Sequence, residues 1–127
     1  MSRQKLIIHE RMPGTNDIID ANRTNKHAGA NQKRKWTRKV ANYCMYSKLK
    51  PVQGQIDLKI TWFEPNRRRD KDNIMGGGLK MILDGLVNAG VIKNDGWKEI
   101  GSIDNYFEVD KKYPRVEVEL IECVDNV

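Results

Sequence analysis

The run Arg67-Arg68-Arg69-Asp70-Lys71-Asp72-Asn73 places two carboxylates among four cationic side chains. In an extended segment, residues two apart point to the same side of the chain, so Asp70 and Asp72 would face the same way. Two carboxylates so placed repel each other unless a cation lies between them, and hard cations such as Mg²⁺ take oxygen ligands of this kind. The surrounding positive charge would attract a phosphodiester. The run therefore indicates metal-dependent chemistry on a phosphate ester.

Simpler roles compete with a metal site in this run. Asp70 or Asp72 could be the N-cap of the helix that follows, and the arginines could neutralise the acids as surface ion pairs. Asn73 could bond the acids or cap the helix, and we favour the cap. A third acid, Asp95, lies in the turn Asn94-Asp95-Gly96 beyond that helix. Spacing alone does not show whether the fold brings Asp95 next to Asp70 and Asp72.

Positive charge is concentrated in one window of the chain. The net charge is +6, yet the window Ala21–Ile56 contains no acid and carries +9, whereas the rest has 14 basic and 17 acidic residues. This asymmetry favours a surface that binds nucleic-acid phosphates over a helix face that only keeps the protein in solution. Together with the cations of the run above, the candidate DNA-binding residues are Lys33, Arg34, Lys35, Arg38, Lys39, Arg67, Arg68, Arg69 and Lys71.

Length and composition exclude several classes of protein. The 127 residues, 39% of them hydrophobic, predict a single domain, 1–127. No apolar stretch is long enough for a membrane span or a signal peptide, so we expect a cytoplasmic protein with no membrane partner. Cys44 and Cys123 lack zinc-site spacing and are expected to be free thiols. The two histidines suggest no catalytic triad, and Gly76–Gly78 is not a phosphate-binding loop, so no nucleotide cofactor is expected.

Hydrophobic periodicity predicts the elements that position these residues. Trp36, Val40, Tyr43 and Cys44 form one apolar helix face, and alternation over Gln55–Phe63 predicts a half-buried strand. Gly90 is the expected C-terminal glycine of a second helix. The expected elements are strands at Lys5–Glu10, Gln55–Phe63, Asn105–Val109 and Arg115–Glu122, helices at Lys33–Ser47 and Leu79–Ala89, and a mobile loop over Arg11–Gln32. This order predicts an α/β or α+β fold, a small mixed sheet with two helices packed on it.

The run RRRDKDN, with ILDGLVNAGVIKND after it, resembles the RusA family of Holliday-junction resolvases over residues 54–122. The resemblance implies a RusA-like, homodimeric, Mg²⁺-dependent endonuclease of bacteria or their phages, with Mn²⁺ as a substitute metal. It would act in DNA recombination and repair by cutting four-way junctions with paired, symmetric phosphodiester hydrolysis. Carried over, the family's catalytic acids and metal ligands match Asp70, Asp72 and Asp95, and its catalytic lysine matches Lys80.

One departure from the family concerns the segment before Lys80. Gly76–Gly78 lengthens the spacing from Asp72, and each glycine disfavours a helix by about 1 kcal/mol relative to alanine. We therefore expect the helix to begin late, after a flexible glycine loop. Lys80 could then reach the acids or only pair with Asp84 at i, i+4.

Other readings of the sequence stay open. Trp36 and Trp62 are expected in the core, whereas Trp97 could be core or a base-stacking platform. A nuclease for other branched DNA or flaps, and a non-catalytic DNA-binding protein on the same scaffold, are the alternative functions.

Overall fold

The computed structural model describes residues 2–123 as a four-stranded mixed sheet with three helices, an α+β fold. In chain order the elements are β1 (Arg3–Ile8), α1 (Thr15–Thr24), α2 (Lys26–Tyr46), β2 (Ile56–Glu64), α3 (Lys71–Asn88), β3 (Ile100–Val109) and β4 (Arg115–Glu122). The predicted class, a small single domain with a mixed sheet, is confirmed, with one helix more than expected.

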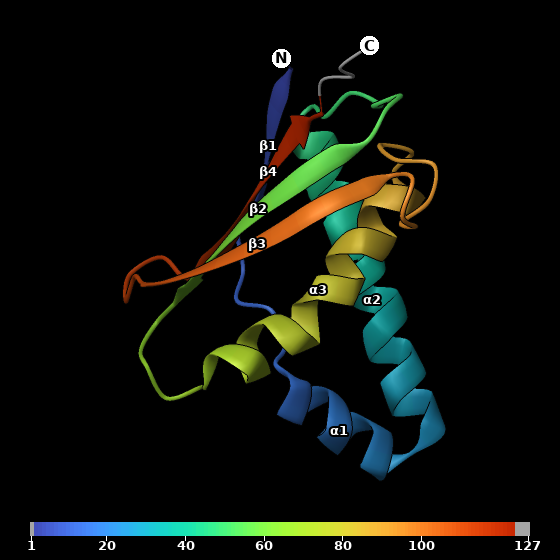
Figure 1. Ribbon diagram of the computed structural model, residues 1–127. Coiled ribbons are helices and arrows are strands. Elements are labelled where there is room, and N and C mark those ends of the chain that lie inside the picture. The colour runs from blue at the N-terminus through green and yellow to red at the C-terminus, as the bar shows by residue number, and fades with distance from the viewer. Residues whose placement is uncertain (1, 124–127) are drawn as a thin grey trace.

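The strands lie in the order β1-β4-β2-β3, so the first and last strands of the chain are neighbours. β4 pairs antiparallel with both β1 and β2, whereas β2 and β3 are parallel. A parallel pair needs a crossover connection, and α3 provides it. Figure 1 shows α2 and α3 on one side of the sheet, with α1 beyond the end of the strands.

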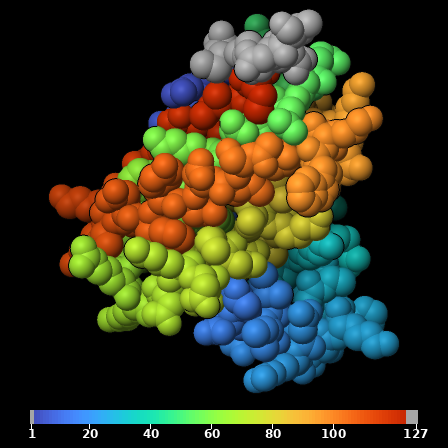
Figure 2. All heavy atoms as spheres, viewed as in Figure 1, coloured from blue at the N-terminus to red at the C-terminus, as the bar shows by residue number. Residues whose placement is uncertain are grey.

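The core lies between the sheet and α2 and α3. The alternation predicted for β2 is confirmed, because Ile56, Leu58, Ile60 and Trp62 are at most 1% exposed. Trp36, at 8% exposed, also belongs to this core as expected. In Figure 2 the strands form one end of the molecule and α1, in blue, forms a lobe at the other end.

The opposite face of the sheet carries ion pairs instead of a second layer. Lys5 and Arg115 both bind Glu117, at 2.5 and 2.6 Å, and the Arg115 guanidinium lies 3.7 Å from the centre of the Phe63 ring. One face of a partly antiparallel sheet can thus remain in water. The helices and their basic residues lie on the other side.

The loop predicted over Arg11–Gln32 is wrong, because most of this stretch is helical. Two capping contacts that periodicity does not reveal define the helices. Asp17 accepts a hydrogen bond from the Gly14 backbone N–H at 2.8 Å at the start of α1, and Asn25 accepts one from the Ala28 N–H at 2.7 Å at the start of α2. The helix predicted at Lys33–Ser47 therefore begins at Lys26.

The late start predicted for the second helix is also wrong. α3 begins at Lys71, and Gly76–Gly78 lie inside it. A Cβ on Gly77 would lie 2.1 Å from the Pro13 carbonyl oxygen, and one on Gly78 would lie 2.9 Å from the Trp62 ring. Close packing of the helix against its neighbours thus explains the glycines and offsets their low helix propensity.

The ends of the remaining elements follow the predictions more closely. β4 matches the predicted strand at both ends, whereas β3 begins at Ile100 and not at Asn105. Gly90 follows α3 with a φ of 75°, as expected of a helix-ending glycine.

Candidate functional site

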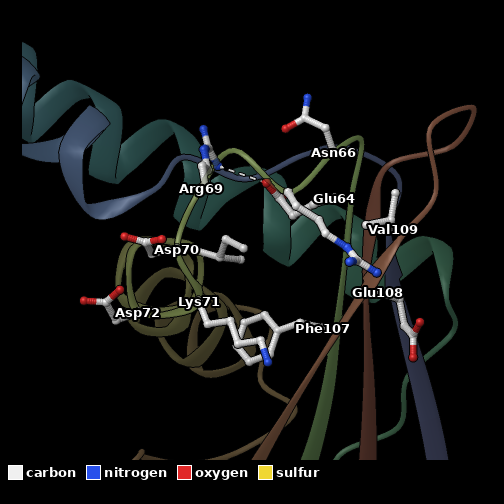
Figure 3. A pocket seen from close by; sticks show the side chains of 11 residues that line it. Glu64, Asn66, Arg69, Asp70, Lys71, Asp72, Phe107, Glu108 and Val109 are labelled. Carbon is white, nitrogen blue, oxygen red and sulfur yellow. Dashed lines mark ion pairs between the residues drawn. The ribbon is translucent and has the colours of Figure 1, made fainter.

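Asp70 and Asp72 lie at the start of α3 and not in an extended segment. Asp70 is the N-cap residue, but its side chain makes no capping hydrogen bond, and Asp72 belongs to the first helical turn. Both side chains are exposed, and neither forms a hydrogen bond or ion pair with another residue of the described part of the chain. In Figure 3 the two carboxylates extend to the same side, and Lys71 extends to the other.

These two acids border a hollow of about 700 Å³ between the start of α3 and the end of β3. Two further acids line it, Glu64 at the end of β2 and Glu108 on β3, and sequence reasoning missed both. The available signal was weak, since Glu64 lies one residue beyond the predicted strand and Glu108 is a single acid inside the predicted strand Asn105–Val109. Lys71 crosses the same hollow, with its ammonium 5.6 Å from the centre of the Phe107 ring.

Glu64 is the buried acid of this hollow, with 7% of its side chain exposed. Arg11 donates to its Oε1 through Nε at 3.1 Å and Nη2 at 2.9 Å. Arg69 lies 3.9 Å from the same oxygen and also donates to the Met12 carbonyl and to Asp17. These contacts attach α1 to the segment before α3, so Arg69 has a structural role here.

Lys80, Asp84 and Asp95 form a second charged cluster near the other end of α3. The Lys80 ammonium lies 2.7 Å from Asp95 Oδ2 and 3.1 Å from Asp84 Oδ1. The hydrogen bond from Lys80 holds the pKa of the Asp95 carboxyl below its usual range, and the same bond raises the pKa of Lys80. Lys80 thus makes the i, i+4 pair with Asp84 and also reaches Asp95.

A groove of about 700 Å³ between α2 and the end of α3 joins this cluster to the basic window. Lys33, Arg34 and Arg38 line it from α2, and Asp84 and Asp95 line it from the opposite side. Its only ion pair among these residues is the one between Lys33 and Asp84, at 3.9 Å. An anionic backbone in this groove would meet three cations and then the two acids that hold Lys80.

The remaining predicted DNA-binding residues differ in their availability. Arg67, Arg68 and Lys35 are exposed, and none forms a close ion pair among residues 2–123, although Lys35 acts on Glu10 at longer range. Lys39 is bound to Glu10 at 2.7 Å and lies 4.6 Å from the centre of the Trp36 ring. The basic residues of α2 therefore lie in two places. Lys33, Arg34 and Arg38 line the groove, whereas Lys39 faces Glu10 at the end of β1.

The structure brings Asp70 and Asp72 together but places Asp95 in the other hollow. Asp72 and Lys80 are eight residues apart on α3, about 12 Å along the axis at 1.5 Å per residue. Within residues 2–123 no three His, Cys, Asp or Glu side chains converge in a way that could hold a metal ion. The carboxylate pair Asp70–Asp72 fits a hard cation by its oxygen donors, whereas Asp95 is held by Lys80.

Asn73 and Trp97 take positions that the sequence left open. The Asn73 side-chain oxygen accepts a hydrogen bond from the Asn16 backbone N–H at 3.0 Å, so it caps the first turn of α1 and not its own helix. Trp97, beside Asp95, is 96% exposed and does not belong to the core.

The chain was compared with family models and with curated proteins. No family model matches the chain, and no curated protein matches it in sequence. No helix in the described part of the chain is both long and apolar enough to cross a membrane.

Proposed function

We propose that this chain is an Mg²⁺-dependent endodeoxyribonuclease that cuts four-way DNA junctions, acting as a homodimer. The observation that carries the proposal is the carboxylate pair at the start of α3. Asp70 and Asp72 extend to the same side beside a hollow and pair with no cation, although Arg67, Arg68 and Lys71 surround them in the sequence. The resemblance of the same run to the RusA family supports this function.

Asp70 and Asp72 would hold the metal, for which Mn²⁺ would substitute. When bound, such an ion lowers the pKa of a coordinated water and stabilises negative charge on the phosphate. Asp95 was expected to join this set, but it lies in the other hollow, where it is bound to Lys80. The helix N-terminus adds a partial positive charge that favours both the carboxylates and an approaching phosphate.

The groove between α2 and α3 would hold the DNA backbone. Lys33, Arg34 and Arg38 supply phosphate contacts, which give affinity but little sequence information. Lys80, kept protonated by Asp95 and Asp84, is the cation at the inner side of this groove. A phosphate there could displace either acid and take the Lys80 ammonium as its own partner.

A twofold dimer would match the substrate, because a four-way junction offers two symmetric strands to cut. Two copies in a fixed relation can hold several arms at once, which a linear duplex does not offer. This geometry would let the dimer select junctions over duplex DNA even though its surface contacts only phosphates.

Cleavage of a synthetic four-way junction tests the proposal. With Mg²⁺ we expect symmetric nicks in two opposing strands, little cutting of a linear duplex of the same sequence, and no activity in EDTA. Asp70→Asn and Asp72→Asn should each lower the cleavage rate at least about 100-fold while junction binding in a gel shift persists. Asp104→Asn, which removes an exposed acid from β3, is the matched control and should cleave normally.

Two outcomes would contradict the proposal and favour another function. Equal cutting of junctions, flaps and duplexes would identify a nuclease of broader substrate range. Junction binding without Mg²⁺-dependent cutting would identify a non-catalytic DNA-binding protein. The acids near the groove would then be explained by the ion pair between Lys80 and Asp95.

A further inference from the structure

Trp97 has an unusual environment for a tryptophan of this chain. Its side chain is 96% exposed, whereas Trp36 and Trp62 are 8% and 1% exposed. An indole exposed to water lacks the large favourable free energy that burial of the ring would provide. Its position therefore points to a ligand that covers the ring.

The backbone that carries Trp97 is held in place by hydrogen bonds. Gln55 Nε2 donates to the Trp97 carbonyl oxygen at 3.1 Å. On either side, the Gly96 N–H donates to Glu99 Oε1 at 3.1 Å, and the Ile100 N–H donates to the Gly96 carbonyl at 3.0 Å. The indole is thus presented to solvent from a fixed turn, which lowers the entropy cost of binding through it.

The loop that carries Trp97 holds two lysines and two acids, and the acids are engaged, Asp95 by Lys80 and Glu99 by the Gly96 N–H. Lys93 and Lys98 are exposed in the same loop, and within residues 2–123 neither has an acidic partner. Both also line a hollow of about 360 Å³ that includes Gln53, Gln55 and the Glu99 carboxylate. A protein partner would favour an apolar surround at the core of its interface, whereas an exposed aromatic ring in a loop with two exposed lysines suits a nucleic acid.

Trp97 also lies close in sequence to the proposed DNA groove. Asp95, two residues earlier, lines that groove opposite Arg34 and Arg38 and holds Lys80. DNA whose phosphates lie along α2 therefore passes near the turn that carries the indole.

We propose that Trp97 stacks on an unstacked nucleobase at the branch point of the bound DNA, with Lys93 and Lys98 on the adjacent phosphates. The inference rests on the proposed function and assigns a specificity residue to it. In a continuous duplex both faces of each internal base are covered, whereas bases at a branch point expose a face. Trp97 thus favours branched DNA over duplex, a preference that phosphate contacts alone do not give.

Tryptophan fluorescence tests the stacking directly. Binding is measured in EDTA, so that no strand is cut, by the anisotropy of a labelled four-way junction and a labelled duplex of the same sequence. We expect the junction to quench the long-wavelength emission of the exposed indole more strongly than the duplex does at equal occupancy. Trp97→Phe should still bind the junction but lose this quench, because only the buried Trp36 and Trp62 remain.

Affinity gives a second readout. Trp97→Ala should weaken junction binding by about 5- to 150-fold, the range expected for one stacked base, and should change duplex binding less. Tyr46→Ala is the matched control, since Tyr46 is 81% exposed but lies at the end of α2, and it should change neither affinity.

Three results would overturn the inference. Junction binding with no Trp97-dependent quench and an unchanged Trp97→Ala affinity would remove the stacking role while leaving the proposed function intact. A Trp97→Ala variant that sediments as a smaller species but binds DNA normally would assign the indole to a contact between copies. Absence of binding to either DNA would overturn this inference together with the proposed function.

Discussion

Glu10 illustrates how a single carboxylate links distant parts of this chain. It follows β1 and accepts hydrogen bonds from Lys39 Nζ and from the Tyr43 hydroxyl on α2, each at 2.7 Å. Partial burial alone would raise the pKa of Glu10, but these two bonds outweigh it and lower the pKa below its usual value. Burial and the bond to Glu10 together raise the pKa of Tyr43 to about 12, so the phenol remains a donor at neutral pH.

Glu10→Gln should therefore lower the free energy of unfolding at pH 7 by about 1 kcal/mol, a value reduced by solvent screening. A carboxyl whose pKa is lowered by folding stabilises the protein above its unfolded pKa and loses this effect as the pH falls through its folded pKa. The difference in stability between wild type and variant should thus narrow as the pH falls below the usual pKa of a glutamate. Urea denaturation at pH 7 and pH 3 measures both differences.

Tyr43→Phe is the matched variant for this linkage. It removes one of the two bonds but leaves Lys39, so it should lose only part of the pH-dependent difference. A stability gap for Glu10→Gln that stays the same at both pH values would contradict the role assigned to the carboxylate.

Among elements, α3 has the clearest consequence for stability. Its glycines allow neighbouring segments to pack closely against the helix. Gly77 and Gly76 differ in the atoms that a Cβ would meet. A Cβ on Gly77 would meet the Pro13 carbonyl at 2.1 Å, whereas one on Gly76 would meet only the Thr15 hydroxyl, at 2.5 Å. The first neighbour is backbone, and the second is the end of a side chain that can rotate.

Gly77→Ala should lower the free energy of unfolding by about 1–3 kcal/mol in spite of the better helix propensity of alanine, because overpacking outweighs it. Gly76→Ala should be neutral or should stabilise the protein by up to about 1 kcal/mol. Urea or thermal unfolding of the two variants compares them. A stabilised Gly77→Ala would show that α3 does not pack against the Pro13-Gly14 turn.

The helices show where sequence reasoning succeeds and where it fails. The apolar face of α2 and the alternation of β2 predicted the core because periodicity reports burial directly. The helical start at Lys71 was not predicted, because local propensity penalises glycine and carries no information on tertiary neighbours. α1 was missed for a related reason, since none of its residues is buried and its caps are single polar contacts.

For the candidate site, the sequence predicted which acids take part but not how they are distributed over the fold. Asp70 and Asp72 were expected on one side of an extended segment, and they extend to one side from the start of a helix. The separation of Asp95 and the involvement of Glu64 depend on how α3 crosses between β2 and β3, which spacing does not reveal.

On the scale of the whole molecule, charge differs between the two sides of the sheet. The exposed face of the sheet carries matched ion pairs, whereas the helical side carries Lys33, Arg34 and Arg38 in a groove with one acid partner. Under the proposed function, this asymmetry would give the DNA one preferred side of the molecule.

Replacing Arg34 and Arg38 together by Gln should weaken binding to both junction and duplex and should lower the salt dependence of binding. The slope of log affinity against log salt should fall by about 1 for each phosphate contact removed. The double variant Lys111→Gln and Lys112→Gln removes the same charge at the exposed turn between β3 and β4, on the other side of the molecule in Figure 1, and should leave the slope unchanged. Equal slopes for both double variants would show that binding follows net charge and not the groove.

The position of β4 between β1 and β2 has a consequence for the order in which this chain can fold during synthesis. β1 is made before the other strands, yet in the sheet formed by residues 2–123 it pairs with β4, the last of these strands, with Arg3 opposite Ile121. Until residues 115–122 emerge, the apolar side of β1 has no neighbouring strand, and β2 lacks its antiparallel partner. The helices can form early from local contacts, but the sheet closes only when β4 arrives. A chain cut short before β4 should therefore be a substrate for chaperones and proteases and not a partly active form.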